Sequence, residues 1–193
     1  MASKPGERKL QILQTVAQML EQPKGEKITT AALAARLELS EAALYRHFAS
    51  KAQMFDGLIE FIEQTVFGLI NKITQEEKSG LKQVEEIISL LLGFAQKNRG
   101  MTRVLIGDAL MNENERLQQR INQLLDRIEA TLKQSLRMAA TQGEMGEADV
   151  AAYANVLLCY VIGRWLLFAK SGFARDPLAQ WPAQSAILLE RKT

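Results

Sequence analysis

The stretch ITTAALAARLELSEAALYRHFASK, residues 28–51, decides which fold the chain is expected to adopt. Apolar residues recur at helical spacing on both sides of the short turn LEL, so the sequence predicts helices over Thr30–Arg36 and Glu41–Phe48. Five of their side chains are expected to pack against a preceding helix: Leu33, Leu37, Ala43, Leu44 and Phe48. Two short helices that meet in this way are typical of a helix-turn-helix motif, here at about residues 29–48.

The second of these helices is expected to leave mainly small and polar side chains on its outer face. They are Ser40, Glu41, Ala42, Tyr45, Arg46 and His47. Small residues near the start of such a helix let its backbone approach base edges in the major groove of DNA. Tyr45 adds a hydroxyl group that can reach the sugar-phosphate backbone. The pattern therefore favours a DNA-recognition helix.

Three residues that flank the two helices are further candidates for contacts with DNA. Thr29 is expected to cap the helix that starts at Thr30, and the hydroxyl group of either residue could bind a phosphate, although capping alone explains Thr29 equally well. Lys51 opens the following helix, where the helix dipole repels a cation. That conflict is relieved if a DNA phosphate, or a carboxylate such as that of Glu41, lies beside its ammonium group.

Helical spacing of apolar residues continues along most of the chain, and no stretch alternates long enough to predict a strand. The sequence predicts an all-α protein of about nine helices. Residues 1–51 are expected to form a three-helix DNA-binding domain, and residues 52–193 a helical bundle for dimerisation and regulation. Further helices are expected over Ala52–Ile73, Leu81–Phe94, Thr102–Met111, 113–137 and Ala148–Lys170, with Gly100 as a terminator and a last short helix after Pro177.

The helix over 113–137 carries a narrow apolar stripe on an otherwise charged surface. The stripe consists of Leu117, Ile121, Leu124, Ile128 and Leu132. Steps of four and three residues fit either a short coiled-coil seam or one face of an amphipathic bundle helix. Both interpretations remain open at this point.

Several classes of function are excluded by residue content. His47 is the only histidine, and no serine, cysteine or carboxylate stands at a suggestive spacing from it, so we expect no catalytic site and no enzyme. The sequence contains neither a glycine-rich phosphate loop nor a cluster of metal ligands, so no cofactor and no metal are expected. The single cysteine, Cys159, is expected to be inert packing in a reducing cytoplasm.

The distribution of charge favours a nucleic-acid partner, and the hydropathy pattern predicts no membrane span. Residues 1–51 hold 8 Lys/Arg against 5 Asp/Glu (8 − 5 = +3), whereas the remainder holds 16 against 17 (16 − 17 = −1). The amino terminus lacks the apolar core of a secretory signal, so a cytoplasmic location is expected. The membrane-length segment Val150–Ala169 contains Asn155 and Arg164, which predicts a buried or interface helix.

The segment ITTAALAARLELSEAALYRHFASKAQMF resembles the DNA-binding module of the TetR family of regulators, with its short turn, the sequence LYRHF and a following lysine. The resemblance implies a TetR-like fold, palindromic double-stranded DNA as a partner, and a homodimer formed through the last helices. It puts five residues at DNA-facing positions: Thr29, Thr30, Tyr45, His47 and Lys51. A dimer is also expected because one short recognition helix reads few bases and because Ala151–Phe168 is strongly apolar.

The segments SEAALYRHF, MFDGLIEFIE, LLLGFAQKN and RINQLLDRIE are similar to one branch of that family, the nucleoid occlusion factors. Such factors bind palindromic chromosomal sites and antagonise assembly of the division protein FtsZ over DNA, so the similarity implies a nucleoid-associated regulator of cell division. It implies an FtsZ-facing surface at Phe61, Leu90, Gly93, Lys97 and Asn98, of which the first three are equally explained by core packing. The chain departs from these factors at Leu69, where they usually carry an arginine, and at Asp108, which replaces a histidine.

Two other functions remain open from the sequence. A ligand-responsive transcriptional repressor would hold a small apolar molecule in the helical bundle. The candidate lining residues are Met101, Leu105, Trp165 and Phe168. A helical interaction protein whose DNA module has lost its function would instead show no salt-dependent binding to DNA.

Overall fold

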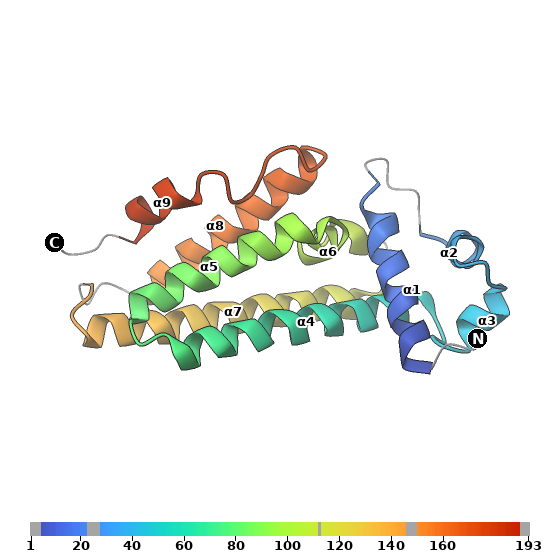
Figure 1. Ribbon diagram of the computed structural model, residues 1–193, viewed down its shortest axis with the longest axis horizontal. Coiled ribbons are helices and arrows are strands. Elements are labelled where there is room, and N and C mark those ends of the chain that lie inside the picture. The colour runs from blue at the N-terminus through green and yellow to red at the C-terminus, as the bar shows by residue number, and fades with distance from the viewer. Residues whose placement is uncertain (1–4, 23–27, 112, 146–149, 190–193) are drawn as a thin grey trace. The chain divides into compact units, whose positions relative to one another are not determined.

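The computed structural model describes residues 5–22, 28–111, 113–145 and 150–189. Within these ranges the chain is helical and forms no β-strand, so the all-α prediction is confirmed. Figure 1 labels these helices, α1 to α9. A 3₁₀ helix, η1, lies between α6 and α7. Their bounds are α1 Pro5–Leu20, α2 Thr30–Arg36, α3 Glu41–Tyr45, α4 Lys51–Glu76, α5 Gly80–Lys97, α6 Arg99–Leu105, η1 Asp108–Leu110, α7 Glu115–Thr141, α8 Val150–Lys170 and α9 Trp181–Leu188.

The chain divides into two compact units. The first unit combines residues 1–62 with residues 98–121, and the second combines residues 63–97 with residues 122–193. The first unit therefore holds α1, α2, α3, α6, η1 and the amino-terminal parts of α4 and α7. The second unit holds α5, α8, α9 and the remaining parts of α4 and α7.

In the first unit, α6 packs closely against α1 (Figure 1). The prediction that Gly100 terminates a helix is wrong, because Gly100 lies in the first turn of α6 and only Asn98 separates this helix from α5. A Cβ atom on Gly100 would lie 1.9 Å from the carbonyl oxygen of Ala17. The glycine is therefore required by the close approach of two helices.

The helix predicted over Thr102–Met111 is shorter than expected. α6 ends at Leu105, and Gly107 follows with a φ of 77°, the left-handed conformation that commonly ends a helix. The N–H group of Gly107 donates to the carbonyl oxygen of Val104 at 3.0 Å. The chain then forms η1 before α7 begins, so residues 106–114 connect two helices in place of extending one.

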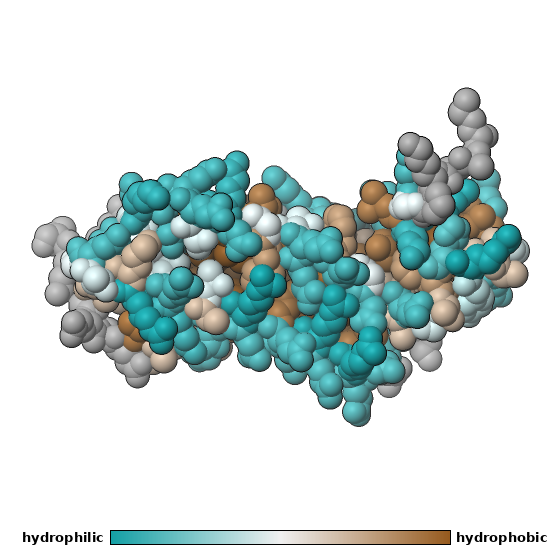
Figure 2. All heavy atoms as spheres, turned by 90° about the horizontal axis from the view of Figure 1, so that it is seen from below, coloured by the Kyte–Doolittle hydropathy of each residue, from teal (hydrophilic) through white to brown (hydrophobic). Residues whose placement is uncertain are grey.

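The second unit is built around apolar side chains of α5, α7 and α8. α5 and α8 lie side by side (Figure 1), and the indole N–H group of Trp165 donates to the carbonyl oxygen of Leu91 at 3.0 Å. Leu124, Ile128 and Leu132 of the α7 stripe are at most 2% exposed. The stripe therefore contributes to the hydrophobic core of the chain. On the face displayed in Figure 2, hydrophilic atoms accordingly predominate and hydrophobic atoms appear in small separate areas.

α8 has an apolar outer face. Val156, Leu166 and Leu167 are 51%, 43% and 45% exposed. The packing predicted for Cys159 is not found within the chain, because Cys159 is exposed, one helical turn beyond Asn155 on the same outer face. The sequence run around Cys159 is apolar on all sides, so its periodicity could not show which side faces outward.

α8 is also the one helix within the described ranges that is long and apolar enough to cross a membrane, judged by length and composition alone. Its Arg164 donates hydrogen bonds to the carbonyl oxygens of Asp176 and Pro177, at 2.8 Å and 3.1 Å, in the segment that follows the helix. The arginine that argues against a membrane span thus holds the chain between α8 and α9.

Candidate nucleic-acid interface

α2 and α3 form the predicted helix-turn-helix. The turn between them contains Glu38, whose φ of 54° is left-handed and reverses the chain within a few residues. Leu33 and Leu44 are fully buried and Phe48 is 7% exposed, so these side chains face the interior as predicted. Three side chains of the opposite face are exposed: Glu41, Ala42 and Tyr45. The predicted orientation of the second helix is therefore confirmed.

α3 is shorter than predicted, because it ends at Tyr45 and not at Phe48. Arg46 and His47 lie in a turn, in which the N–H group of His47 donates to the carbonyl oxygen of Leu44 at 3.0 Å. The turn keeps Phe48 buried while the chain changes direction toward α4. His47 is half-buried at this turn, whereas Arg46 is exposed.

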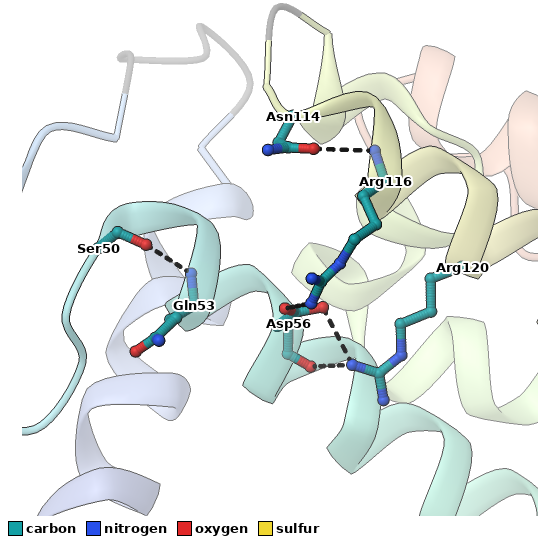
Figure 3. Close-up of polar contacts among 6 residues, drawn as sticks. All are labelled: Ser50, Gln53, Asp56, Asn114, Arg116 and Arg120. Carbon is teal, nitrogen blue, oxygen red and sulfur yellow. Dashed lines mark hydrogen bonds and ion pairs between the residues drawn. The ribbon is translucent and has the colours of Figure 1, made fainter.

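A cap at the start of α4 was missed from the sequence. The hydroxyl oxygen of Ser50 accepts a hydrogen bond from the N–H group of Gln53 at 3.2 Å (Figure 3), and the side-chain oxygen of Gln53 accepts one from the N–H group of Ala49 at 2.8 Å. Serine followed three residues later by glutamine is the sequence signal of a capping box. That signal, present in SKAQ, could have located the helix start.

Thr29 and Ser40 cap the two helices of the motif. The hydroxyl oxygen of Thr29 accepts from the N–H group of Ala32, and that of Ser40 from the N–H group of Ala43, both at 3.1 Å. A hydroxyl oxygen that accepts a hydrogen bond still has a hydrogen to donate. Both residues are exposed, so capping and contact with a phosphate are compatible roles for each.

Three of the predicted site residues form a chain of hydrogen bonds between α2 and α3. The hydroxyl group of Thr30 donates to the carboxylate of Glu41 at 2.6 Å. The hydroxyl group of Tyr45 donates to the hydroxyl oxygen of Thr30 at 3.5 Å. These hydrogen bonds link Tyr45 to Thr30 and join the two helices of the motif.

Lys51, the first residue of α4, pairs with a carboxylate that sequence reasoning missed. Its ammonium group forms an ion pair with Glu113, and its nitrogen lies 5.7 Å from the ring centre of Phe55. Glu113 thus relieves the charge conflict at the helix start, the part that the sequence suggested for Glu41. Because 62 residues separate the two partners, no spacing rule connects them.

The amino-terminal parts of α4 and α7 are joined by a second set of ion pairs (Figure 3). Arg116 and Arg120 of α7 lie 2.8 Å and 3.1 Å from the carboxylate of Asp56 on α4. Arg120 also donates to the backbone carbonyl oxygen of Asp56 at 3.0 Å. Asn114 caps α7 by accepting from the N–H group of Arg116 at 3.0 Å. The segment around Glu113 is therefore held beside the start of α4.

A hollow of about 550 Å³ lies in the first unit beside these contacts. Its lining includes four of the predicted DNA-contact residues: Thr29, Thr30, Tyr45 and Lys51. Glu113 lines it as well, from the segment before α7. The fold thus brings together residues of α2, α3, α4 and the α6–α7 connection, whereas Ala42 stands on the open outer face of α3.

Comparison with known proteins identifies the family. Residues 17–58 match the model of bacterial regulatory proteins of the tetR family, and residues 78–192 match a tetracyclin repressor-like, SlmA-like C-terminal domain. The nucleoid occlusion factor SlmA of Alteromonas mediterranea is 53% identical, over 96% of this chain and 95% of that protein. The one of Marinomonas sp. is 49% identical, over 98% and 97%. The chain belongs to the SlmA family of nucleoid occlusion factors.

Solved structures agree with this assignment at the level of fold. A TetR transcription regulator from Haloarcula marismortui superposes with a TM-score of 0.80 at 15% identity, covering 96% of this chain and 97% of that chain. The TetR family regulator PfmR from Thermus thermophilus reaches 0.78 at 23% identity, covering 94% and 98%. The predicted TetR-like fold is confirmed.

The residues that similarity to SlmA factors suggested as an FtsZ-facing surface are divided between the two units. Phe61 and Asn98 belong to the first unit, and Leu90, Gly93 and Lys97 to the second. Lys97 is exposed and the other four are half-buried.

The four candidate lining residues of a ligand pocket are all buried. Their exposed fractions are 8% for Met101, 2% for Leu105, 0% for Trp165 and 2% for Phe168. The indole N–H group of Trp165 is used by the carbonyl oxygen of Leu91, as in a packed core. The hollow described above is lined by other residues, close to the helix-turn-helix.

Proposed function

We propose that the protein binds palindromic chromosomal sites as a homodimer and, when bound, inhibits assembly of the FtsZ ring over the nucleoid. The observation that carries the DNA part is the outer face of α3, where exposed Ala42 leaves the backbone accessible and Tyr45 reaches Thr30 at the capped start of α2. The part that concerns FtsZ rests on membership in the SlmA family. Binding to the chromosome implies a nucleoid-associated, cytoplasmic protein.

Candidate groups for phosphate contacts lie next to this face. Thr29 and Ser40 retain a hydroxyl hydrogen to donate, and Lys51 contributes a cation at the start of α4. Groups of this kind fix the register of the protein on the duplex, whereas contacts from the outer face of α3 read base edges. Arg46 and His47 extend the same face at the turn after α3.

Dimerisation is supported by the outer face of α8. Val156, Leu166 and Leu167 expose apolar side chains on one helix, and Ile187 of α9 is 73% exposed. A Cβ atom on Gly163 would meet no atom within 4 Å, so a partner helix can approach closely at that residue. Two recognition helices of a dimer would lie about 34–36 Å apart, one helical turn of DNA, and select a palindrome.

The residues proposed to face FtsZ are Phe61 and Asn98 in the first unit and Leu90, Gly93 and Lys97 in the second. None of the five is fully buried, so each retains atoms that a partner can contact. Core packing contributes at Gly93, where a Cβ atom would lie 3.7 Å from Leu178. Leu69, 43% exposed on α4, gives an apolar contact where related factors offer a charge.

The test is FtsZ polymerisation, followed by light scattering, with this protein and either its cognate palindrome or a scrambled duplex. The palindrome is first obtained by chromosome-wide mapping of bound sites. We expect stronger inhibition with the palindrome, and we expect Ala42→Leu to remove the difference because the added bulk obstructs the groove. Ala130→Leu, at an exposed position of α7, is the matched control.

Equal inhibition with both duplexes would contradict the proposed coupling between DNA binding and FtsZ inhibition.

The chromosome-wide map of bound sites also distinguishes nucleoid occlusion from the alternative function. Many scattered palindromes agree with nucleoid occlusion, whereas one site beside a neighbouring operon, released by a small apolar metabolite, indicates a ligand-responsive repressor.

A further inference from the structure

The ammonium group that Lys51 offers to DNA already holds a contact within the protein. The group is ion-paired with Glu113, and the side chains of the two residues are 29% and 18% exposed. The pair lines the hollow that also contains Thr29 and Tyr45, two other predicted DNA contacts. A phosphate that approaches Lys51 from this side therefore meets the carboxylate of Glu113, which is already paired with the ammonium group.

The position of Glu113 is set by its surroundings. Its backbone N–H group donates to the carbonyl oxygen of Leu110, the last residue of η1, at 3.0 Å. The next residue, Asn114, caps α7, and Arg116 and Arg120 bind Asp56 on α4 (Figure 3). Contacts on both sides of Glu113 thus keep its carboxylate beside Lys51 and limit its movement into solvent.

We propose that Glu113 competes with DNA phosphate for Lys51 and thereby lowers the affinity of the protein for DNA. The inference rests on the proposed function, in which Lys51 contacts a phosphate. Binding then requires an exchange of partners, in which the ammonium group leaves the carboxylate and joins the phosphate. The exchange takes place at the phosphate backbone, so it weakens binding to all sequences and does not select among them.

The experiment compares DNA binding by Glu113→Gln and Glu115→Gln. Both changes remove one negative charge from neighbouring positions, but Glu115 is exposed at the start of α7 and does not pair with Lys51. The amide of glutamine keeps the shape of the side chain and ends the competition for the cation. Dissociation constants are measured by fluorescence anisotropy for the cognate palindrome and a scrambled duplex over a series of salt concentrations.

We expect Glu113→Gln to bind both duplexes about three- to fivefold more tightly than Glu115→Gln at low salt, the size expected when one partly exposed ion pair no longer has to be broken. Its affinity should also fall more steeply with salt, by up to about one unit in the logarithmic slope, because Lys51 is then fully available to a phosphate. Thermal unfolding followed by circular dichroism verifies that both variants are folded.

Lys51→Ala and the double variant Lys51→Ala/Glu113→Gln complete a double-mutant cycle for this ion pair. The gain should vanish when Lys51 is absent, so the double variant should bind like Lys51→Ala. The inference is overturned if Glu113→Gln binds like Glu115→Gln, or if its gain persists without Lys51. Either result leaves the proposed function intact. A wild-type protein that binds neither duplex would contradict both the inference and the proposed function.

Discussion

Thr29 illustrates how one residue serves the fold and the proposed site together. Its hydroxyl oxygen caps α2, and its side chain lines the hollow beside Lys51. A substitution that removes the hydroxyl group alters both roles, so a loss of DNA binding in such a variant would not reveal which role matters. Variants that keep the cap and change only the charge separate the two roles.

We expect Thr29→Ala to lower the free energy of unfolding by about 1 kcal/mol, since a helix loses its cap. Thr29→Asp should retain that stability, because aspartate caps helices well, but should bind DNA about tenfold more weakly through repulsion of phosphate. Thr29→Asn, a cap without charge, is the control. Urea denaturation measures the stability and fluorescence anisotropy measures the affinity for DNA. Normal DNA binding by Thr29→Asp would show that Thr29 caps α2 and does not contact DNA.

At the scale of single residues, several local features were predicted from the sequence, although the cap at Ser50 was missed. The cap at Thr29 and the outward position of Ala42 follow from spacing within one motif. The partner of Lys51 did not follow, because Glu113 lies 62 residues away. Cys159 was misjudged for a related reason, since an apolar sequence does not show which of its residues lack neighbours in the fold.

At the scale of elements, the close packing of α6 on α1 fixes the first unit. The contact occurs at Gly100, which has no side chain and can therefore lie directly against the backbone of Ala17. α1 is the helix that buries the inner side of the motif, with Ile12 and Val16 at most 1% exposed. A substitution at Gly100 should therefore disturb the packing of α1, against which α2 and α3 lie.

We expect Gly100→Ala to lower the free energy of unfolding by about 1–3 kcal/mol, because its methyl group would overlap a backbone carbonyl and force α6 away from α1. Gly68→Ala is the matched control. Gly68 lies inside α4 with no atom near its Cβ direction, so alanine there should stabilise the helix by about 0.5–1 kcal/mol. Urea denaturation measures both, and a neutral effect of Gly100→Ala would contradict the assigned packing.

Helix existence was easier to predict from the sequence than helix ends. α2 has the predicted bounds, Thr30–Arg36, because its cap and its turn lie next to it in the chain. α3 ends three residues early and α6 is cut short at Leu105. In both cases the end is set by a turn, whose geometry depends on where the following helix must pack.

At the scale of the whole molecule, the outer face of α8 determines the expected assembly. Leu166 is 43% exposed there, beside Leu167 and one turn from Ile162. Apolar side chains gathered on one helix face are stabilised when a second copy covers them, and two copies supply the two recognition helices that a palindrome needs.

We expect Leu166→Glu to convert the proposed dimer into a monomer, since two carboxylates would be forced together without water at a two-fold interface. DNA binding should weaken in parallel, because a monomer contacts one half-site. Leu69→Glu, which replaces a leucine of equal exposure on α4, should remain dimeric. Light scattering after size-exclusion chromatography gives the masses, and a dimeric Leu166→Glu would exclude α8 from the interface.

The sequence by itself determined that the chain is helical, that residues 28–51 form a helix-turn-helix, and which face of its second helix points outward. These features follow from periodicity, capping and turns, which act between residues a few positions apart. Only the tertiary structure decided that Glu113 pairs with Lys51, that Asp56 binds Arg116 and Arg120, and that Gly100 touches Ala17. Those contacts join residues about 60 or more positions apart, and they exist because the packing of whole helices brings them together.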